Sequence, residues 1–550
     1  MSYENLKIIP LGGLGEVGMN CLIYEWNNES IMVDCGIMFP DEESGVEIIR
    51  PSFEYVLSNQ QKLRALILTH GHEDHIGAVP FLLKYFDVPV FCSRFVSGLI
   101  TSKNKEVSPY IQFNPVIVKD GSKINIGNIE IEFVGVNHSI PESMSLYIKT
   151  PGGNIFHSSD FKFGSLSDRD YFLEEKFSRI GLSGVDLMLG DSTNIEREGW
   201  TNSESSVENT IRAIIENTSS RVFITFFPSN IYRMNAFLEI AKSLKKKVVL
   251  LGRSMKRYYK IALATGLIFD DNFPIIIPSA KNLTNDSNII FLISGTQGEK
   301  RSATSKISRG EHNTIRIKKG DTFIFSSRHI PGNEIRISKV MDGIAKQGGI
   351  VYHTGNTPDV HVSGHGHRKE LETMLKLISP SFFIPIHGTY HYMSQHAKMA
   401  YSLGIKDVVV LENGEVVSFN KNSGLKKESG VPAGKVMMDG DVEVGTEVIE
   451  ARRAISEGGV IVAVLWINNA IQEIEEEKIK VSCHGINRNK TGIEGEITAL
   501  IQKWLRTAQK TDKLLEGEIK KKLRRRIESY CYKYMEKCPY VIVEVINCEE

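Results

Sequence analysis

The sequence contains no apolar run long enough to cross a membrane, and its first residues lack the basic segment followed by an apolar stretch that marks a secretory signal. Cysteine is scarce: seven residues are scattered along the chain, and none belongs to a Cys-x-x-Cys pair. An odd and dispersed set of cysteines is no disulfide framework and predicts reduced thiols. These absences lead us to expect a cytoplasmic protein without membrane association.

The chain also lacks net charge, because 66 basic residues balance 66 acidic ones. A balanced chain can still bind nucleic acid, but only through a local field. With 550 residues, the chain exceeds what one hydrophobic core usually holds, so several domains are expected. Its hydrophobic fraction of 41% is ordinary for a globular protein.

The sequence does contain a dense cluster of metal-ligand side chains: His70, His72, Asp74 and His75. An apolar run at residues 65–69 predicts a buried strand before the cluster, and the apolar spacing at 76–85 predicts a helix after it. The cluster should therefore lie at the carboxyl end of a strand, where α/β sheets place their sites. Imidazole and carboxylate suit zinc or a similar divalent ion. His70 and His72 alternate and can reach one ion, while Asp74 and His75 can turn toward a second.

Three further candidate ligands follow apolar runs in the same way. His138 comes after residues 129–134, Asp160 after 154–157, and His387 after 382–386. Alone, His138 or Asp160 would be more typical of a polar residue with ordinary hydrogen bonds than of a ligand. For the first cluster, at residues 70–75, the alternative is a polar loop that happens to hold histidines, but exposed turns seldom need three imidazoles. The series therefore favours one metal site assembled from strand ends.

A glycine-rich segment near the start, Gly13-Leu14-Gly15-Glu16-Val17-Gly18, matches the G-x-G-x-x-G pattern of dinucleotide sites, which requires a helix next. Residues 19–26 are instead rich in strand formers, so we expect a turn between two strands and no NAD site. The following strand ends at Asp34, which is either an ordinary turn residue or the partner that orients a ligand histidine.

The character of the chain changes after Trp200. Strand-type runs alternate with helical ones, which predicts an α/β domain with a parallel sheet over residues 203–350. Loops 227–233 and 326–334 are each either a helix cap or a phosphate site. The histidine- and glycine-rich loop at 361–367 suits an anionic oxygen. We expect His367 and His391 to be surface residues.

The pattern His-x-His-x-Asp-His resembles the signature of the metallo-β-lactamase superfamily. An inserted domain, an acid at Asp191, the histidine-rich loop and a late histidine at 387 resemble its β-CASP branch, which acts on nucleic acids. Further motifs are similar to the bacterial ribonuclease J family: Asp-Ser-Thr-Asn at 191–194, Gly-Arg-Ser-Met at 252–255, Thr-Gln-Gly-Glu at 296–299, Pro-Gly-Asn-Glu at 331–334 and His-Val-Ser-Gly-His-Gly at 361–366. The resemblance covers residues 7–420 closely and is highly specific.

This resemblance implies an α/β fold: a metallo-β-lactamase αββα sandwich with an inserted α/β β-CASP domain and a small α/β C-terminal domain. The limits we expect are 1–202 and 351–430 for the two parts of the sandwich, 203–350 for the insert, and 431–550 for a linker and the C-terminal domain.

The chain departs from the family pattern in two places. It has Tyr232 where the family usually has histidine, so Tyr232 is left out of the binding residues. It has His484-Gly485-Ile486 where the family often has Arg-Gly-Phe, so a role of that motif stays open. A basic run at residues 520–526 either contacts RNA phosphates or forms a solvated helix face.

The resemblance also implies a site. Two divalent ions, zinc or manganese, would be bound by seven residues. His70, His72 and His138 would hold one ion, Asp74, His75 and His387 the other, and Asp160 would bridge them. His365 would stabilise the transition state or protonate the leaving 3′ oxygen, and Asp191 would orient a neighbouring histidine. The substrate phosphate would be held by Ser229, Asn230, His361, Val362, Ser363, Gly364 and His365.

The activity implied is that of a ribonuclease that cuts single-stranded RNA as a 5′-to-3′ exonuclease and as an endonuclease, in RNA maturation and decay. A homodimer or homotetramer, with other RNA-decay proteins as partners, is expected. One alternative is a small-molecule metallohydrolase, which would need neither the inserted domain nor the 361–367 loop. A DNA-processing β-CASP nuclease is a second. An inactive RNA-binding paralogue is a third, and the filled ligand positions argue against it.

Overall fold

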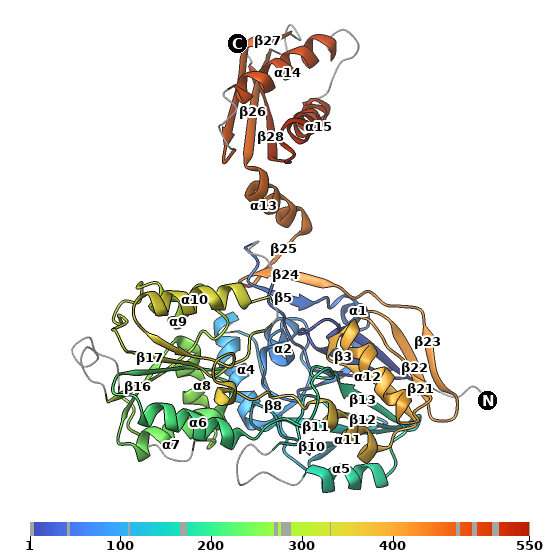
Figure 1. Ribbon diagram of the computed structural model, residues 1–550. Helices are drawn as coiled ribbons and strands as arrows, with labels where there is room; N and C mark the ends of the chain where they lie inside the picture. Colours follow the sequence, from blue (N-terminus) through green and yellow to red (C-terminus); the bar gives the residue numbers. More distant parts are fainter. Residues whose placement is uncertain are drawn as a thin grey trace. The chain divides into compact units, whose positions relative to one another are not determined.

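The structure is a computed structural model that describes residues 5–40, 45–107, 110–164, 173–268, 273–276, 288–330, 332–468, 473–486, 492–508 and 516–548 (Figure 1). Pro331, which belongs to one of the motifs above, lies outside these residues. The chain divides into two compact units, one of Met1–Asp41 and Ile48–Val436, the other of Glu42–Glu47 and Met437–Glu550. None of the described helices is long and apolar enough to cross a bilayer.

The first unit contains an eight-stranded sheet in the order β23-β22-β1-β3-β4-β6-β7-β8. Its first strands form antiparallel hairpins, and β4, β6, β7 and β8 are parallel neighbours. The strands are β1 (Leu6–Gly12), β3 (Cys21–Trp26), β4 (Glu29–Val33), β6 (Leu63–Ile67), β7 (Val90–Cys92), β8 (Pro115–Ile117), β22 (Val416–Asn420) and β23 (Gly424–Glu428). The glycine-rich segment joins β1 to β3, as the strand formers after it predicted.

A second, seven-stranded sheet has the order β21-β19-β13-β12-β11-β10-β9. Strands β12, β13 and β19 are parallel, so their carboxyl ends meet at one edge. The strands are β9 (Lys123–Ile126), β10 (Ile129–Gly135), β11 (Met144–Thr150), β12 (Gly153–His157), β13 (Leu187–Asp191), β19 (Phe382–Ile386) and β21 (Asp407–Val408).

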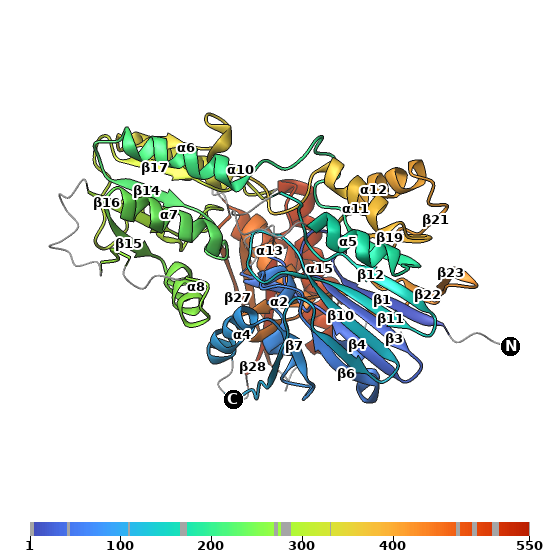
Figure 2. The same cartoon turned by 90° about the horizontal axis from the view of Figure 1, so that it is seen from below.

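The two sheets pack face to face, as the stacked strands in Figure 2 show. Side chains that alternate along both sheets, among them Tyr24, Phe133, Leu146 and Phe419, form the core between them. The outer face of the seven-stranded sheet is covered by α5 (Leu173–Leu182), α11 (Arg368–Ile378) and α12 (Tyr390–Ser402). Beside the eight-stranded sheet lie α3 (Val79–Leu82) and α4 (Arg94–Val107). This is the expected αββα sandwich.

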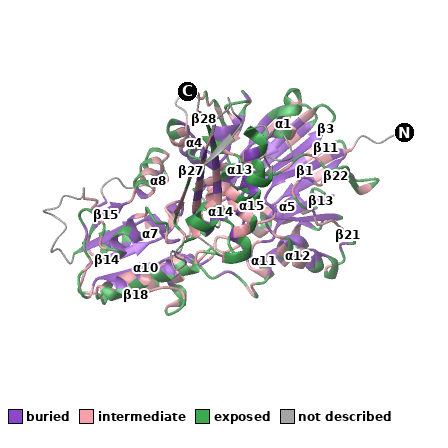
Figure 3. Cartoon of the chain, turned by 90° about the horizontal axis from the view of Figure 1, so that it is seen from above, coloured by how far each residue is buried: buried purple, intermediate pink, exposed green. Residues whose placement is uncertain are grey.

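Between β13 and β19 the chain forms a separate parallel sheet in the order β15-β16-β14-β17-β18. Its inner strands β14, β16 and β17 are buried, because helices cover both faces, whereas the edge strand β18 is partly exposed (Figure 1 and Figure 3). The strands are β14 (Val222–Thr225), β15 (Lys247–Leu251), β16 (Ile289–Ile293), β17 (Thr322–Phe325) and β18 (Ile350–Tyr352). The helices are α6 (Glu204–Glu216), α7 (Ile231–Ser243), α8 (Arg253–Ala264), α9 (Ala303–Ser308) and α10 (Glu334–Lys346). The predicted inserted α/β domain is therefore present, and we propose the limits 203–350 for it.

The second unit has its own core, built on the sheet β27-β26-β28. Its elements are β25 (Val442–Val444), α13 (Thr446–Gly458), β26 (Val460–Asn468), β27 (Glu473–His484), α14 (Ile493–Ala508), α15 (Glu516–Met535) and β28 (Tyr540–Cys548). The basic run lies on α15, where Lys520, Lys522 and Arg524 pair with acids on the same helix or on β28. These pairs favour the solvated helix face over an RNA contact.

One local prediction is wrong. The continuous helix expected over residues 76–85 is instead two short turns, α2 (Glu73–Ile76) and α3. Pro80 lies at the start of α3 and has no backbone N–H to continue a helix from the preceding turn. The apolar spacing that predicted the helix arises because both turns are buried.

Candidate metal centre

The predicted site residues follow the carboxyl ends of strands. His70 follows β6, His138 follows β10, Asp160 follows β12 and His387 follows β19. Three non-glycine residues there adopt the left-handed conformation: Asp34 with φ 61°, Ser159 with φ 53° and His387 with φ 53°. This conformation is unfavourable for L-residues and recurs at functional sites, where the surrounding structure holds it.

His70, His72 and His138 converge on one point. The Nδ1 atom of His72 lies 3.1 Å from Nε2 of His70 and 3.0 Å from Nε2 of His138. Asp160 completes the group, with Oδ2 3.5 Å from Nε2 of His70. One ligand atom from each of the four residues lies within 4.8 Å of all the others.

Asp74, His75 and His387 form a second group of the same kind. Nε2 of His387 is 3.4 Å from Oδ2 of Asp74 and 3.6 Å from Oδ1 of Asp160. Nε2 of His75 is 3.3 Å from Oδ2 of Asp160. Asp160 therefore faces both groups, which is the position of a bridging ligand. A third overlapping group adds Asp191 and His365 to Asp160 and His387.

The ring nitrogens that point away from the centre have acceptors, and this fixes the protons. Nδ1 of His138 donates to the carbonyl oxygen of Gly364 at 2.7 Å, and Nδ1 of His75 donates to Oδ2 of Asp34 at 2.7 Å. The hydroxyl of Thr69 donates to Asp34 and so accepts from Nδ1 of His70 at 3.0 Å. In its neutral form, each ring therefore has a lone pair on Nε2 that is directed into the centre, and this is the form that binds a metal. Asp34 is thus the hydrogen-bond partner of His75, which the sequence predicted to be a ligand.

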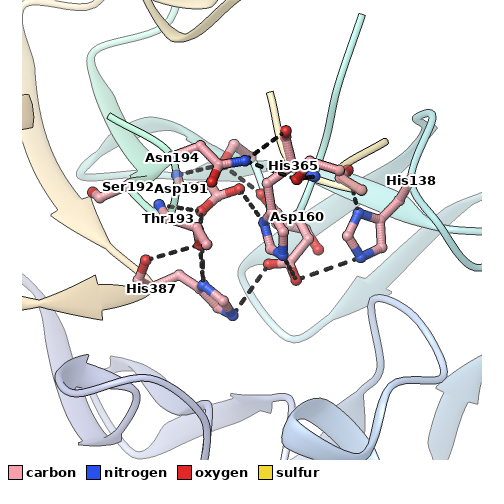
Figure 4. A network of polar contacts seen from close by, with 12 residues as sticks. His138, Asp160, Asp191, Ser192, Thr193, Asn194, His365 and His387 are labelled. Atoms are coloured by element: carbon pink, nitrogen blue, oxygen red, sulfur yellow. Dashed lines mark hydrogen bonds and ion pairs between the residues drawn. The ribbon is translucent and has the colours of Figure 1, made fainter. Parts of the chain in front are cut away.

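His387 is held in the same way through two residues (Figure 4). The hydroxyl of Thr193 donates to Oδ1 of Asp191 at 2.6 Å and accepts from Nδ1 of His387 at 2.6 Å. Nε2 of His387 is buried and has no hydrogen-bond partner. An orphaned buried nitrogen among carboxylates is costly alone and is satisfied by a cation. The donor set therefore fits two divalent ions.

The electrostatics of the two groups differ. Burial lowers the pKa of His70 and His138 well below the ordinary value and that of His72 to about 4, so these rings stay neutral. Burial also tends to lower the pKa of His75 and His387, but the charges of Asp160 and neighbouring carboxylates outweigh it. They raise the pKa of His75 well above the ordinary value and that of His387 to about 9. The second group thus favours positive charge, which a divalent cation supplies.

His365 lies beside both groups and is oriented by Asp191. Its Nδ1 donates to Oδ2 of Asp191 at 2.8 Å, while its Nε2 faces Oδ2 of Asp160 at 3.8 Å (Figure 4). Burial would lower the pKa of His365, but the charges of Asp191 and Asp160 outweigh it and raise that pKa. A protonated imidazole with one nitrogen facing the centre suits a proton donor.

Ser363 and Gly364 line the same centre. The hydroxyl oxygen of Ser363 accepts from Nδ2 of Asn194 at 2.8 Å and from the backbone N–H of His365 at 3.1 Å, so its own O–H is left to donate elsewhere. A Cβ at Gly364 would lie 2.5 Å from Oγ of Ser139 and 3.1 Å from Cε1 of His138, so only glycine allows the loop to approach these two residues so closely.

The other predicted substrate residues contact Arg233, are buried or belong to the N-terminal end of α7. His361 accepts at Nδ1 from Nη1 of Arg233 at 2.9 Å, and Val362 is buried. Asn230 is the N-cap of α7, accepting from the N–H of Arg233 at 2.9 Å, and Ser229 precedes it. The helix-cap alternative therefore holds for Asn230, which is linked to the 361–365 loop through Arg233. Of the two histidines expected at the surface, His391 is exposed, whereas His367 is half-buried at the start of α11.

Sequence reasoning missed the residues that orient the ligands. Thr193 and Thr69 fix ring protons, and Asn194 holds Ser363. The signal available in the sequence was the Asp-Ser-Thr-Asn motif at 191–194. Arg233, Glu204 and Lys162, which form a buried ionic network behind the loop, gave no local signal.

The sandwich and its histidine–aspartate centre define a metallo-hydrolase of the β-lactamase superfamily. The family model "Beta-lactamase superfamily domain" matches residues 30–225, and "Zn-dependent metallo-hydrolase RNA specificity domain" matches 358–411. Residues 219–344 match "Ribonuclease J, beta-CASP domain", and 447–548 match "Ribonuclease J C-terminal domain".

Curated relatives agree with these matches. The chain is 34% identical over 476 residues to Ribonuclease J 1 of Streptococcus pyogenes, covering 86% of this chain and 85% of that protein. It is 37% identical over 476 residues to Ribonuclease J of Mycobacterium tuberculosis, covering 84% of each. The chain belongs to the ribonuclease J family and is a metal-dependent, RNA-binding ribonuclease.

A solved structure supports the fold alone. The crystal structure of a protein of unknown function from Enterococcus faecalis V583 superposes with a TM-score of 0.55 at 16% identity, covering 76% of this chain and 100% of that chain.

Proposed function

We propose that this ribonuclease uses two divalent ions to remove nucleotides from the 5′-monophosphate end of single-stranded RNA, and that it also cuts single strands internally. One observation carries the proposal: Asp160 faces both ligand groups, and ring nitrogens that can bind a metal are directed at them. His70, His72 and His138 would hold one ion, Asp74, His75 and His387 the other. Zinc or manganese suits this set of imidazoles and carboxylates.

When bound, two such ions make hydroxide available near neutral pH and neutralise charge that grows on the scissile phosphate. The chain supplies the proton for the leaving 3′ oxygen from Nε2 of His365. Asp191 holds Nδ1 of that ring at 2.8 Å, which keeps Nε2 directed at the centre and favours the imidazolium.

The 5′ preference is supported by the 361–365 loop. The free O–H of Ser363 offers a donor to a phosphate oxygen, close to His365 and to the Gly364 carbonyl that orients His138. A terminal monophosphate fits beside the centre with the scissile bond one nucleotide further on, whereas a triphosphate is bulkier and more charged. Double-stranded RNA should resist cleavage, because the site takes up a single strand.

In the cell, this activity would serve RNA maturation and decay. A homodimer or homotetramer, working with other RNA-decay proteins, is part of the proposal. Light scattering of the purified protein tests the assembly, and a monodisperse monomer at cellular concentration would contradict it.

The activity is tested by incubating purified protein with end-labelled RNA bearing a 5′ monophosphate, triphosphate or hydroxyl, and with DNA of the same sequence. We expect fastest release of mononucleotides from monophosphate RNA, with slower internal products. Equal release from all three RNA ends would refute the 5′-phosphate pocket. Faster cleavage of DNA would favour a DNA-processing nuclease.

A further inference from the structure

Two arginines flank Asn194, the residue that holds the Ser363 hydroxyl. Arg328, in the loop after β17, donates from Nη1 to Oδ1 of Asn194 at 3.2 Å. Arg197 belongs to the same turn as Asn194, since its backbone N–H donates to the Asn194 carbonyl at 2.9 Å. The two guanidinium groups thus come from the inserted domain and from the sandwich.

The Asn194 amide shows on which side of the pocket Arg328 lies. Nδ2 donates to Oγ of Ser363 at 2.8 Å and to the His365 carbonyl at 2.9 Å, as Figure 4 shows for the labelled residues. Arg328 can only donate, so it must face the amide oxygen, and the carbonyl of His365 must face the amide nitrogen. Arg328 therefore contacts the amide oxygen, whereas Ser363 and His365 contact the amide nitrogen, so Arg328 lies beside the Ser363 pocket and reaches it through Asn194.

The backbone of Arg328 is held in place. Nε2 of Gln297 donates to the Arg328 carbonyl at 2.9 Å, and Oε1 of Gln297 accepts from the N–H of Ile330 at 2.8 Å. These two hydrogen bonds order the backbone of the loop before any ligand binds. Binding through Arg328 therefore does not require the backbone to be ordered at that moment.

Within the described part of the chain, neither Arg197 nor Arg328 forms an ion pair. Neighbouring arginines differ in this respect: Arg368 pairs with Glu198, and Arg233 with Glu204. Partial burial lowers the pKa of both unpaired guanidines, and the charge of Arg328 lowers that of Arg197 further, so the two repel each other. Two uncompensated cations at the edge of a phosphate pocket form a site for a second anion.

We propose that Arg197 and Arg328 bind a second RNA phosphate, on the 5′ side of the terminal-phosphate pocket. This inference rests on the proposed function of Ser363. A monophosphate end would fill the Ser363 pocket and leave the arginine pair empty. The pair would be occupied by the next phosphate upstream in an internal RNA segment, or by the outer phosphates of a 5′-polyphosphate end. It would therefore support internal cleavage rather than removal of monophosphate ends.

The test compares the wild type, R197Q, R328Q and the double variant on three RNAs of one sequence: circular, 5′-triphosphate and 5′-monophosphate. We expect the double variant to lower kcat/KM on circular RNA about tenfold more than on monophosphate RNA, mainly through KM. Its plot of log kcat/KM against log salt on circular RNA should be shallower by about 0.7, because single strands lose about 0.7 per phosphate contact and the pair binds one phosphate. If kcat/KM falls more on circular RNA than on monophosphate RNA, the ligand of the arginine pair is the upstream phosphate. If it falls more on triphosphate RNA, the ligand is the outer part of the 5′-triphosphate end.

R64Q serves as the matched control, since Arg64 is exposed near the start of β6, at the opposite end of that strand from His70. If the double variant loses activity equally on all three RNAs, or behaves like R64Q, the arginine pair is no second phosphate site. If the wild type itself shows no preference for monophosphate ends, the pocket at Ser363 is refuted, and with it the basis of this inference. The two failures are therefore distinguishable.

Discussion

The guanidinium of Arg233 donates to both carboxylate oxygens of Glu204, at 2.9 and 2.8 Å, and both side chains are buried. Glu204 begins α6 of the inserted domain, and Lys162 follows Asp160, a proposed metal ligand, in the sandwich. Nζ of Lys162 lies 3.4 Å from Glu204 and donates to the carbonyl of Ser363 at 3.1 Å. One buried carboxylate therefore compensates two buried cations behind the 361–365 loop.

Replacing Glu204 by Gln should strongly destabilise the first unit, because it leaves Lys162 and Arg233 buried without a counter-charge. Removing one partner of a buried pair costs about 3–5 kcal/mol. Denaturant unfolding measures this loss. The matched control is Glu208→Gln on the same helix, where an exposed i,i+4 pair with Arg212 at 3.7 Å contributes about 0.3–0.5 kcal/mol. Equal stability of the two variants would contradict the role of Glu204.

The Glu204 contribution should depend on pH. Burial would raise the pKa of Glu204, but Arg233 and Lys162 outweigh it, so the pKa in the folded protein is below the ordinary value of 4.5. A carboxyl group with a depressed pKa stabilises the folded state above its unfolded pKa, and this stabilisation is lost as the pH falls through the folded value. The difference in unfolding free energy between wild type and Glu204→Gln should thus be constant near neutrality and shrink below about pH 4.5. A difference that grows on acidification has the wrong sign.

The proposed roles of His387 and His365 separate a ligand from a proton donor. His387→Ala should lower the metal content, because Nε2 is one of three donors in the second group. His365→Ala should keep most of the metal and slow cleavage by about 10²–10⁴-fold. Elemental analysis and single-turnover rates measure the two effects. Activity that survives a strong chelator, or equal loss of metal in both variants, would overturn the assignment.

Asp34→Asn should weaken metal binding although Asp34 is no ligand. The carboxylate accepts from the N–H and hydroxyl of Thr69, both at 2.8 Å, and from Nδ1 of His75. An amide nitrogen at either position would meet a donor and disturb the ring of His75. Loss of such a supporting contact costs about 10–100-fold in metal affinity. Competition with a fluorescent chelator measures this, and wild-type affinity in the variant would show that His75 needs no such support.

Ser363→Ala removes the hydroxyl donor that the 361–365 loop directs toward a terminal phosphate in the proposed function. We expect the ratio of monophosphate to hydroxyl-end turnover to fall about tenfold, as one charge-assisted hydrogen bond contributes about 1.5 kcal/mol or more. Internal cleavage should change less, because it does not begin at a terminal phosphate. A preserved ratio would mean that another group recognises the 5′ end.

The sequence by itself determined the elements and the chemistry, because both have short-range causes. Apolar runs predicted the buried strands, and the imidazoles within residues 70–75 indicated a metal. The motifs also sufficed to indicate the family. Where local spacing failed, at 76–85, a proline within the run broke the helix that the apolar pattern predicted.

The tertiary structure alone decided which distant groups meet. His138 donates its Nδ1 proton to Gly364, 226 residues away, and Thr193 joins Asp191 to His387 across 194 residues. No periodicity encodes such pairs, since they depend on which strand ends the parallel sheets bring to one edge. The same holds for Arg233, which sequence reasoning passed over and which anchors His361 and Glu204 through a guanidinium buried between two domains. Hydrogen-bond partners fix the protons on the ligand rings, so the form in which the site binds metal is a property of the fold.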